Sequence, residues 1–273
     1  MSLVSTEWLF KNKDTVKIID SSWHLPSENR NGFEEYSSTH IPNSIYFDID
    51  RNSDPSSNLP HMLPDKHLWG KIMSSLGISN KDRIVIYDNS KVLSSCRLWY
   101  TLLYFGHNKE LVNVLNGGLE MWMKNNFPTT ASQTRIIQSN YMASENRFMV
   151  KNLNEINQNI KSKVFKLIDA RSKDRFDGKL KEPRDGVRSG SIENSICIPF
   201  NDVIKNDKTF KDNDKLKIIF HNVINNEDKN NVVFSCGSGI TSCVLALAYS
   251  LINNNYNPTI YDGSWAEYGK IFK

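Results

Sequence analysis

The chain has 273 residues, of which 39% are hydrophobic and 23% are charged, and its formal net charge is +4. This length favours two domains of ordinary size, and the composition excludes an intrinsically disordered protein. The small and dispersed charge argues against a nucleic-acid-binding protein, and the lack of any apolar stretch of about 18 residues argues against a membrane span.

The start of the chain and its cysteines favour a cytoplasmic protein. Residues 1–10 contain Glu7 and lack a basic region followed by an apolar core, so we expect no signal peptide. The four cysteines form no Cys-x-x-Cys motif, and a chain of this length does not need disulfides; they are Cys96, Cys197, Cys236 and Cys243. We therefore expect reduced thiols. The histidines show no metal-ligand spacing, so we expect neither a metal nor another cofactor.

Elements of the same kind follow one another twice along the chain. In the first copy we expect strands at 16–20 and 83–88, a helix at 96–105, and a strand followed by a Gly turn at 112–118. In the second copy we expect strands at 165–169 and 231–236, a helix at 241–252, and a strand followed by a Gly turn at 259–263. Each copy ends on a Gly turn and a Trp, Trp122 and Trp265. Alternating strands and helices indicate parallel α/β units, and the repeat indicates two similar domains.

The boundary between these domains is expected where the pattern is weakest. Residues from Pro128 to about Met149 are polar and show no clear periodicity. We therefore predict an N-terminal domain at 1–130, a linker at 131–148 and a C-terminal domain at 149–273.

The most informative segment is Cys236-Gly237-Ser238-Gly239-Ile240-Thr241-Ser242, between a β-type run and a helical run. Its two glycines allow several backbone N–H groups to point toward one centre, and the start of a helix adds a partial positive charge. Such a loop stabilises an anion, so it is expected to lower the pKa of the Cys236 thiol and to favour the nucleophilic thiolate. The alternative is a buried structural cysteine at the end of a core strand.

A cysteine-dependent phosphatase would use a similar loop, with an arginine six residues after the cysteine to hold the phosphate. That position here is Ser242. Without a bidentate guanidinium, phosphoryl transfer lacks its main charge clamp. The sequence therefore argues against phosphatase or arsenate chemistry.

The repeated pattern, the Asp-Gly-Ser-Trp turn at 262–265 and the loop at Cys236 together resemble the rhodanese-like sulfurtransferases. Within that family the loop is similar to that of the 3-mercaptopyruvate sulfurtransferase branch, because thiosulfate-preferring relatives typically have basic residues inside it. The resemblance covers nearly the whole chain. It implies an α/β fold of two tandem rhodanese-like domains, each a mainly parallel sheet with helices on both faces. Asn89, matched to Cys236 in the first copy, cannot form a persulfide, so that copy is expected to be catalytically inactive.

Further segments resemble the family's substrate-binding stretch. Arg175-Phe176 and Glu182-Pro183-Arg184-Asp185-Gly186 match the region where the family keeps two arginines. The resemblance implies that Arg175 and Arg184 bind the carboxylate and the keto oxygen of mercaptopyruvate, and guanidinium groups suit a planar α-keto acid. The alternative is a pair of surface arginines in a charged loop. The substrate-binding set also includes four residues of the cysteine loop, namely Gly237, Gly239, Ile240 and Thr241.

Two segments of the first copy, 47–50 and 61–64, resemble those that face the active site in the family. By this resemblance Asp50, His61 and Ser238 would form a relay like that of serine proteases, in which Asp50 orients His61 and His61 exchanges a proton with Ser238 or the leaving enolate. The alternative for His61 is a solvent-exposed side chain in a Pro-rich loop.

The resemblance implies sulfur transfer from 3-mercaptopyruvate onto Cys236 as a persulfide, with release of pyruvate. Thioredoxin, a small thiol or cyanide would then accept the sulfur, and a monomer is expected. Two alternatives remain open, a thiosulfate:cyanide sulfurtransferase and a non-catalytic persulfide carrier that docks a partner protein.

Overall fold

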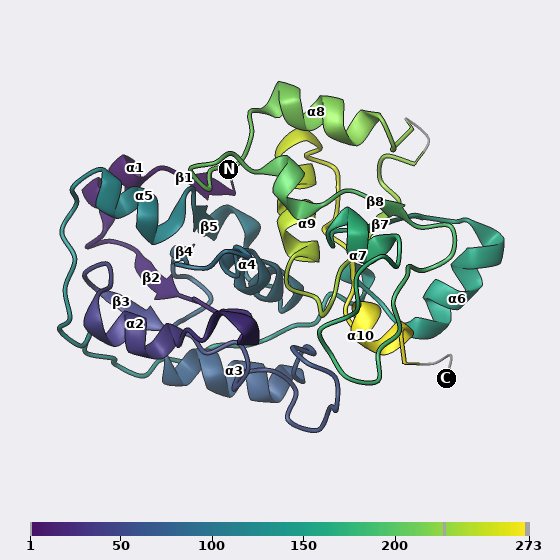
Figure 1. The fold of residues 1–273 in the computed structure, drawn as a ribbon. Coiled ribbons are helices and arrows are strands. Elements are labelled where there is room, and N and C mark those ends of the chain that lie inside the picture. Colours follow the sequence, from purple (N-terminus) through teal and green to yellow (C-terminus); the bar gives the residue numbers. More distant parts are fainter. Residues whose placement is uncertain (1, 226–227, 271–273) are drawn as a thin grey trace. The chain divides into compact units, whose positions relative to one another are not determined.

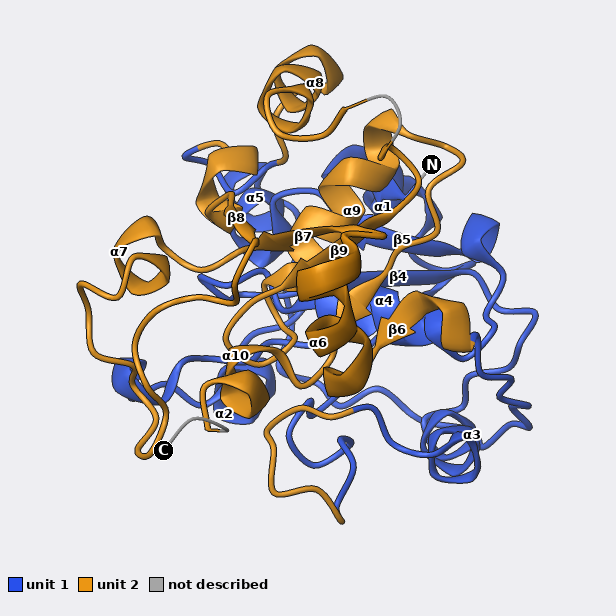
Figure 2. Cartoon of the chain, turned by 90° about the vertical axis from the view of Figure 1, so that its right-hand side faces the viewer, with its two compact units in different colours: residues 1–55, 63–146, 206–209 blue, residues 56–62, 147–205, 210–273 orange. Residues whose placement is uncertain are grey.

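The fold comes from a computed structural model, which describes residues 2–225 and 228–270. The predicted domain ends at residues 1 and 273 lie outside these ranges. The chain divides into two compact units (Figure 2). Unit 1 comprises residues 1–55, 63–146 and 206–209, and unit 2 comprises residues 56–62, 147–205 and 210–273. The short segment 56–62, which contains His61, thus belongs to the second unit although it lies in the first copy of the sequence pattern.

Unit 1 contains a five-stranded parallel sheet in the order β1-β5-β4-β2-β3 (Figure 1). Its strands are β1 (Leu3–Val4), β2 (Lys17–Asp20), β3 (Ser44–Tyr46), β4 (Ile84–Tyr87) and β5 (Val112–Leu115). Its α-helices are α1 (Thr6–Asn12), α2 (Gly32–Ser38), α3 (Lys66–Ser75), α4 (Ser95–Tyr104) and α5 (Gly118–Lys124), with short 3-10 helices at Pro26–Glu28 and Lys109–Leu111.

Unit 2 contains a sheet of the same kind, in the order β6-β10-β9-β7-β8. Its strands are β6 (Val150–Lys151), β7 (Lys166–Asp169), β8 (Ile196–Cys197), β9 (Val232–Ser235) and β10 (Ile260–Tyr261). Its α-helices are α6 (Leu153–Ser162), α7 (Lys173–Phe176), α8 (Asn213–His221), α9 (Ser242–Ile252) and α10 (Ser264–Tyr268), with 3-10 helices at Arg147–Met149 and Phe200–Val203. The strands and helices expected from the sequence are confirmed in both copies, with ends that differ by a few residues.

The side chains of β9 explain how helices come to cover both faces of the sheet. Successive side chains of a strand point to opposite faces. Val233 packs in one apolar cluster with Trp265 of α10. Phe234, the next residue, lies with its ring centroid 6.1 Å from those of Phe220 in α8 and Tyr249 in α9. The predicted α/β architecture, with helices on both faces of a parallel sheet, is therefore confirmed.

Each sheet has a long loop at the carboxyl edge of its central strand. We call residues 88–94, between β4 and α4, the aspartate loop, and residues 236–241, between β9 and α9, the cysteine loop. Parallel sheets bind ligands at this edge because the loops that leave the strands converge there.

The strand register gives the residue of unit 1 that corresponds to Cys236. Tyr87 ends β4 and Ser235 ends β9, and each pairs with an aspartate that ends the neighbouring strand. The next residue is Asp88 in one loop and Cys236 in the other. The prediction that Asn89 matches Cys236 is therefore wrong by one position, because the alignment of the strands, and not the similarity of the loop sequences, sets the correspondence.

In the part of the chain that the structure describes, no helix is both long enough and apolar enough to cross a membrane.

Candidate active site

Cys236 lies buried in the cysteine loop, with 1% of its surface exposed. Its Sγ accepts a hydrogen bond from the N–H of Gly239 at 3.2 Å and lies 3.6 Å from the Ser242 hydroxyl. Gly239 has a φ of +80°, a backbone conformation that favours glycine. The backbone of Cys236 is fixed on its other side, where its carbonyl accepts from the N–H of Trp265 at 3.0 Å. The thiol is thus held in one place and surrounded by donors.

These donors shift the pKa of the thiol. Burial is the largest influence on Cys236 and raises its pKa, but hydrogen bonds from the Thr241 hydroxyl, the N–H groups of Ser238 and Ser242, and the Ser242 hydroxyl outweigh it. The pKa of Cys236 is therefore lowered, as the loop sequence predicts. Cys197 shows the opposite case, because burial raises its pKa to about 12. Cys236 is thus much the better source of a thiolate.

Two guanidinium groups lie directly beside Gly237. A Cβ atom built on this glycine would lie 3.1 Å from Nη2 of Arg175 and 3.6 Å from Nη1 of Arg184. The absence of a side chain at Gly237 therefore leaves room for both groups next to the residue that follows Cys236. The two arginines that the sequence singles out are brought together here, and their positive charges suit an anionic, planar ligand.

A buried acidic residue, Glu182, holds one of these arginines. Glu182 is 4% exposed, and its Oε1 accepts hydrogen bonds from Nη1 of Arg171 at 2.8 Å and from Nε of Arg175 at 3.1 Å. Its Oε2 accepts from Nη2 of Arg175 at 2.5 Å. Arg171 is also buried and pairs with Asp169 through Nη2 at 2.7 Å. Glu182 is not among the predicted site residues, although an acid between two arginines in one short stretch is a signal for pairing.

His61 contacts the cysteine loop through Ser238. Its Nδ1 lies 3.1 Å from the Ser238 carbonyl oxygen and 3.0 Å from the Ser238 hydroxyl. Because a carbonyl can only accept, this contact requires the hydrogen on Nδ1. The Ser238 hydroxyl also accepts from Nη2 of Arg184 at 3.1 Å. The one Nδ1 hydrogen is shared between the carbonyl and hydroxyl oxygens of Ser238, so neither this contact nor that with Arg184 uses the hydroxyl proton, which can point elsewhere.

His61 itself is constrained. It is 5% exposed, and its φ of 62° lies in the left-handed region, which non-glycine residues adopt at a cost. The alternative of a solvent-exposed histidine is therefore wrong. Asp50 is an exposed residue of unit 1 whose carboxylate accepts from the indole N–H of Trp23 at 2.9 Å. Its part in a relay stays a prediction.

The two remaining residues of the predicted set lie at the end of the loop. Ile240 is 3% exposed, so its side chain is part of the interior, and its carbonyl accepts from the N–H of Cys243 at 3.1 Å. Thr241 directly precedes α9 and acts on the Cys236 thiol through its hydroxyl.

The aspartate loop of unit 1 already contains an anion at the matching place. The Asp88 carboxylate accepts hydrogen bonds from the N–H of Ser90 and from the N–H of Ser95, both at 2.9 Å. The Asp88 carbonyl accepts from the N–H of Leu119 at 3.0 Å, just as the Cys236 carbonyl accepts from Trp265. This loop therefore has the same framework without a nucleophile.

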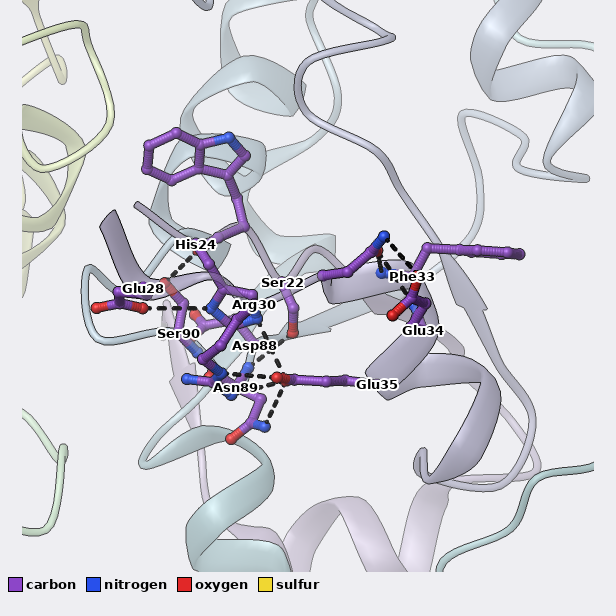
Figure 3. A network of polar contacts seen from close by, with 12 residues as sticks. Ser22, His24, Glu28, Arg30, Phe33, Glu34, Glu35, Asp88, Asn89 and Ser90 are labelled. Atoms are coloured by element: carbon purple, nitrogen blue, oxygen red, sulfur yellow. Dashed lines mark hydrogen bonds and ion pairs between the residues drawn. The ribbon is translucent and has the colours of Figure 1, made fainter. Parts of the chain in front are cut away.

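Arg30, which contacts the aspartate loop at Asn89, is paired within unit 1. Figure 3 shows Arg30 and Glu35 beside Asn89. Arg30 donates from Nε and Nη2 to the two oxygens of Glu35 at 2.6 and 2.7 Å, and its Nη2 also donates to the Asn89 carbonyl at 3.1 Å. The Asn89 amide donates to Glu35 at 3.0 Å. Arg30 and Asn89 thus form hydrogen bonds with Glu35 inside unit 1.

Both repeats match the same family model. The model of the rhodanese-like domain matches residues 5–125 and 152–270. The chain belongs to the rhodanese-like family. Members with similar sequences cover nearly all of it. It is 37% identical to "Thiosulfate/3-mercaptopyruvate sulfurtransferase 1, mitochondrial" of Arabidopsis thaliana, over 97% of this chain and 75% of that protein.

Two further comparisons agree with this membership. The chain is 34% identical to the 3-mercaptopyruvate sulfurtransferase of Mus musculus, over 98% of this chain and 91% of that protein. The crystal structure of SseA from Escherichia coli, a 3-mercaptopyruvate sulfotransferase, has a TM-score of 0.85 and 29% identity, and the match covers 98% of this chain and 100% of that one. The predicted membership is confirmed, and sulfur transfer is the activity that these rhodanese-like relatives support.

Proposed function

We propose that this chain transfers sulfur from 3-mercaptopyruvate, through a persulfide on Cys236, to a thiol or cyanide acceptor and releases pyruvate. The observation that carries this proposal is the buried Cys236 thiol of lowered pKa, in a loop whose Gly237 lies beside the guanidinium groups of Arg175 and Arg184. The names of the relatives support the choice of donor.

In the first half-reaction, Arg175 and Arg184 bind the carboxylate and the keto oxygen of the donor, and the Cys236 thiolate attacks the donor sulfur. An S–S bond forms, the bond between sulfur and C3 breaks, and the electron pair of that bond goes to C3. The product is the enolate of pyruvate, which takes up one proton at C3, equal to the proton lost by the donor thiol. Cys236 then carries the outer sulfur as a persulfide anion, stabilised by the surrounding N–H groups.

In the second half-reaction the outer sulfur leaves Cys236. Cyanide attacks it and forms thiocyanate, and the electron pair of the S–S bond returns to the Cys236 thiolate. With small thiols or thioredoxin, two thiol groups become a disulfide, the sulfur leaves as sulfide, and the thiolate is again restored.

Ser238 is proposed to donate a hydrogen bond to the oxygen of the enolate as it forms. Its oxygen accepts from His61 and Arg184, so its proton can point toward the substrate. His61 fixes this orientation, and we propose that Asp50 supports His61 in the relay. The backbone at Gly237, Gly239, Ile240 and Thr241 is proposed to complete the binding site.

A paired assay of wild type and Cys236→Ser tests the proposal. Each protein receives 3-mercaptopyruvate or thiosulfate with cyanide or a reducing thiol, and pyruvate, sulfide and thiocyanate are quantified. We expect faster turnover of 3-mercaptopyruvate by the wild type and none by Cys236→Ser. Sulfur transfer by the variant would refute the role of Cys236, and stoichiometric loading without turnover would instead indicate a persulfide carrier.

Thiosulfate is the second candidate donor, favoured by the name of the Arabidopsis relative. It is a dianion, and residues 237–241 of the loop contain no basic side chain. We therefore propose 3-mercaptopyruvate as the preferred donor, and a higher kcat/KM for thiosulfate would reverse this choice.

Three wider features belong to the same proposal. The domain at 1–130 is proposed as an inactive copy, the segment at 131–148 as a linker, and the domain at 149–273 as the catalytic one. A monomer suffices because the proposed groups come from one chain, and light scattering after gel filtration tests this. The sequence has no Cys-x-x-Cys motif, and we propose the reducing cytoplasm as its compartment; localisation of the tagged full chain to mitochondria would contradict that assignment.

A further inference from the structure

Glu182 determines which donors of Arg175 remain for a ligand. A guanidinium has five N–H donors in a fixed plane. Glu182 takes the Nε–H and one of the two hydrogens on Nη2. The hydrogens on Nη1 and the second one on Nη2 stay available, and these two nitrogens lie 3.8 and 3.1 Å from a Cβ built on Gly237. The edge of Arg175 that faces the cysteine loop is thus the edge that Glu182 leaves open.

Glu182 is in turn fixed from behind by Arg171. Arg171 is 2% exposed and its guanidinium is held by Asp169, Glu182 and the Gly190 carbonyl. It also lies over the ring of Trp265, at 4.4 Å from the ring centroid. The backbone N–H of Trp265 donates to the Cys236 carbonyl. One continuous set of contacts therefore joins the backbone of the nucleophile to Arg175.

We propose that Glu182 is a positioning residue that sets the guanidinium of Arg175 for the carboxylate of the sulfur donor. This inference rests on the proposed function and deepens it, because it assigns the geometry of carboxylate recognition to a group that does not touch the donor. The Arg175 side chain is 25% exposed and has several rotatable bonds. Glu182, with 2% of its side chain exposed, removes that freedom before the donor binds, so the entropy of ordering Arg175 is not lost during binding.

A merely structural role for Glu182 predicts something different. Arg171 already has Asp169 on its other side, and a structural acid would need only the bond to Arg171. Glu182 instead uses both carboxylate oxygens on Arg175. A positioning role therefore predicts a defect in donor binding that depends on Arg175, and a structural role predicts a loss of stability that does not.

The first experiment compares wild type with Glu182→Gln, which keeps the size of the side chain and removes its charge. We expect kcat/KM for 3-mercaptopyruvate to fall about 10- to 100-fold, mainly through a higher KM, as for the loss of a charge-assisted hydrogen bond. Asp177→Asn is the matched control. Asp177 directly follows α7, the helix that contains Arg175, and forms an exposed ion pair with Lys173. This substitution should leave kcat/KM for 3-mercaptopyruvate unchanged.

A second measurement separates failure of this inference from failure of the proposed function. Cys236 is loaded with sulfur from inorganic polysulfide, which has no carboxylate, and the release of thiocyanate to cyanide is followed. Glu182→Gln should release it at the wild-type rate. A wild type that forms thiocyanate but never turns over 3-mercaptopyruvate would refute the proposed donor, whereas a wild-type KM for that donor in Glu182→Gln would overturn only the positioning role.

A double-mutant cycle with Arg175→Gln decides whether Glu182 acts through Arg175. In that background Glu182→Gln should cause no further loss of kcat/KM, and additive losses would overturn the inference. If Glu182→Gln does not fold, Glu182→Asp keeps the charge beside Arg171 but is one methylene too short to keep all three bonds. A folded Glu182→Asp protein with the wild-type KM would likewise overturn it.

Discussion

The aspartate loop of unit 1 and the cysteine loop of unit 2 occupy the same place in two sheets of the same topology. In both loops the carbonyl of the first residue accepts a hydrogen bond at 3.0 Å from a backbone N–H in the next helix but one, from Leu119 in α5 or from Trp265 in α10. The side chain of that first residue accepts a hydrogen bond from a backbone N–H within its own loop. The first residue is Asp88 in one loop and Cys236 in the other. The fold thus supplies an anion-binding loop, and one side chain decides whether the anion is a fixed carboxylate or a reactive thiolate.

The residue after this position separates the loops further. Asn89 in unit 1 carries a side chain that binds Glu35, and Glu35 occupies Arg30. Gly237 in unit 2 has no side chain, and guanidinium groups lie in the space beside it. The side chains beside the first loop are thus paired with one another, whereas two guanidinium groups lie beside the second loop.

The strand-end acids show a third difference. Asp20 ends β2 and accepts from the N–H of Ser22, and Asp169 ends β7 and accepts from the N–H of Arg171. The guanidinium of Arg171 also forms an ion pair with the Asp169 carboxylate, whereas the uncharged Ser22 cannot form an ion pair with Asp20. Burial consequently raises the pKa of Asp20 to about 7.

The largest expected effect comes from exchanging the two first residues. Cys236→Asp should keep the fold, because the loop of unit 1 holds the same carboxylate, and should lower turnover at least about 10³-fold, since the nucleophile is gone. The double variant Asp88→Cys, Cys236→Ser should also be inactive, because Arg30 beside the first loop is paired with Glu35 and is not available to bind the donor. Pyruvate formation measures both, and activity in the double variant would mean that the loop alone suffices.

The strand-end acids should respond in opposite directions. Asp169→Asn leaves the buried Arg171 without its closest charge and should lower the free energy of unfolding by about 3 kcal/mol. Asp20→Asn should raise it at alkaline pH. The folded chain holds a proton on Asp20 up to about pH 7, and the unfolded chain releases it near pH 4, so this stability is present in acid and is lost as the pH rises.

Urea unfolding at pH 5 and pH 8 measures this pair. The gain from Asp20→Asn should be larger at pH 8, about 1–3 kcal/mol. An equal gain at both values would contradict the raised pKa, and a stabilising Asp169→Asn would contradict the role of the ion pair.

The arginine beside Ser238 provides a finer test of donor binding. Arg184→Lys keeps the charge but loses the planar fork, so it should lower kcat/KM for 3-mercaptopyruvate by about 10- to 30-fold. Arg30→Lys in unit 1 is the matched control and should leave kcat/KM near the wild-type value. A similar fall in both variants would remove the functional difference between the loops.

The smallest effect concerns the pH dependence of thiol reactivity. Because the pKa of Cys236 is lowered, its thiolate persists at lower pH than that of an ordinary cysteine. Alkylation by iodoacetamide at pH 7, followed by mass spectrometry of the peptides, should therefore favour Cys236 over Cys197, whose pKa is about 12, by at least about threefold. Raising the pH should reduce the difference in labelling between Cys236 and Cys197. Preferential labelling of Cys197 at neutral pH would contradict the lowered pKa of Cys236.

The α/β class, the repeat and the strand–loop–helix setting of Cys236 can be predicted from the amino-acid sequence alone. An apolar run, a loop with two glycines and an apolar helix are local patterns, and local backbone preferences suffice to predict them. The resemblance to the family then singled out Arg175 and Arg184, and the structure places both beside Gly237.

The remaining features depend on contacts between residues that are distant in the sequence. The match of Asp88 with Cys236 follows from strand register, which the loop sequence does not contain. His61 contacts a residue 177 positions away, and Glu182 gains its importance from two arginines that fold back on it. The pKa of Cys236 depends on the balance between burial and nearby donors. Such contacts depend on how distant segments pack against one another. Local sequence patterns determine the secondary structure of each segment but not this packing.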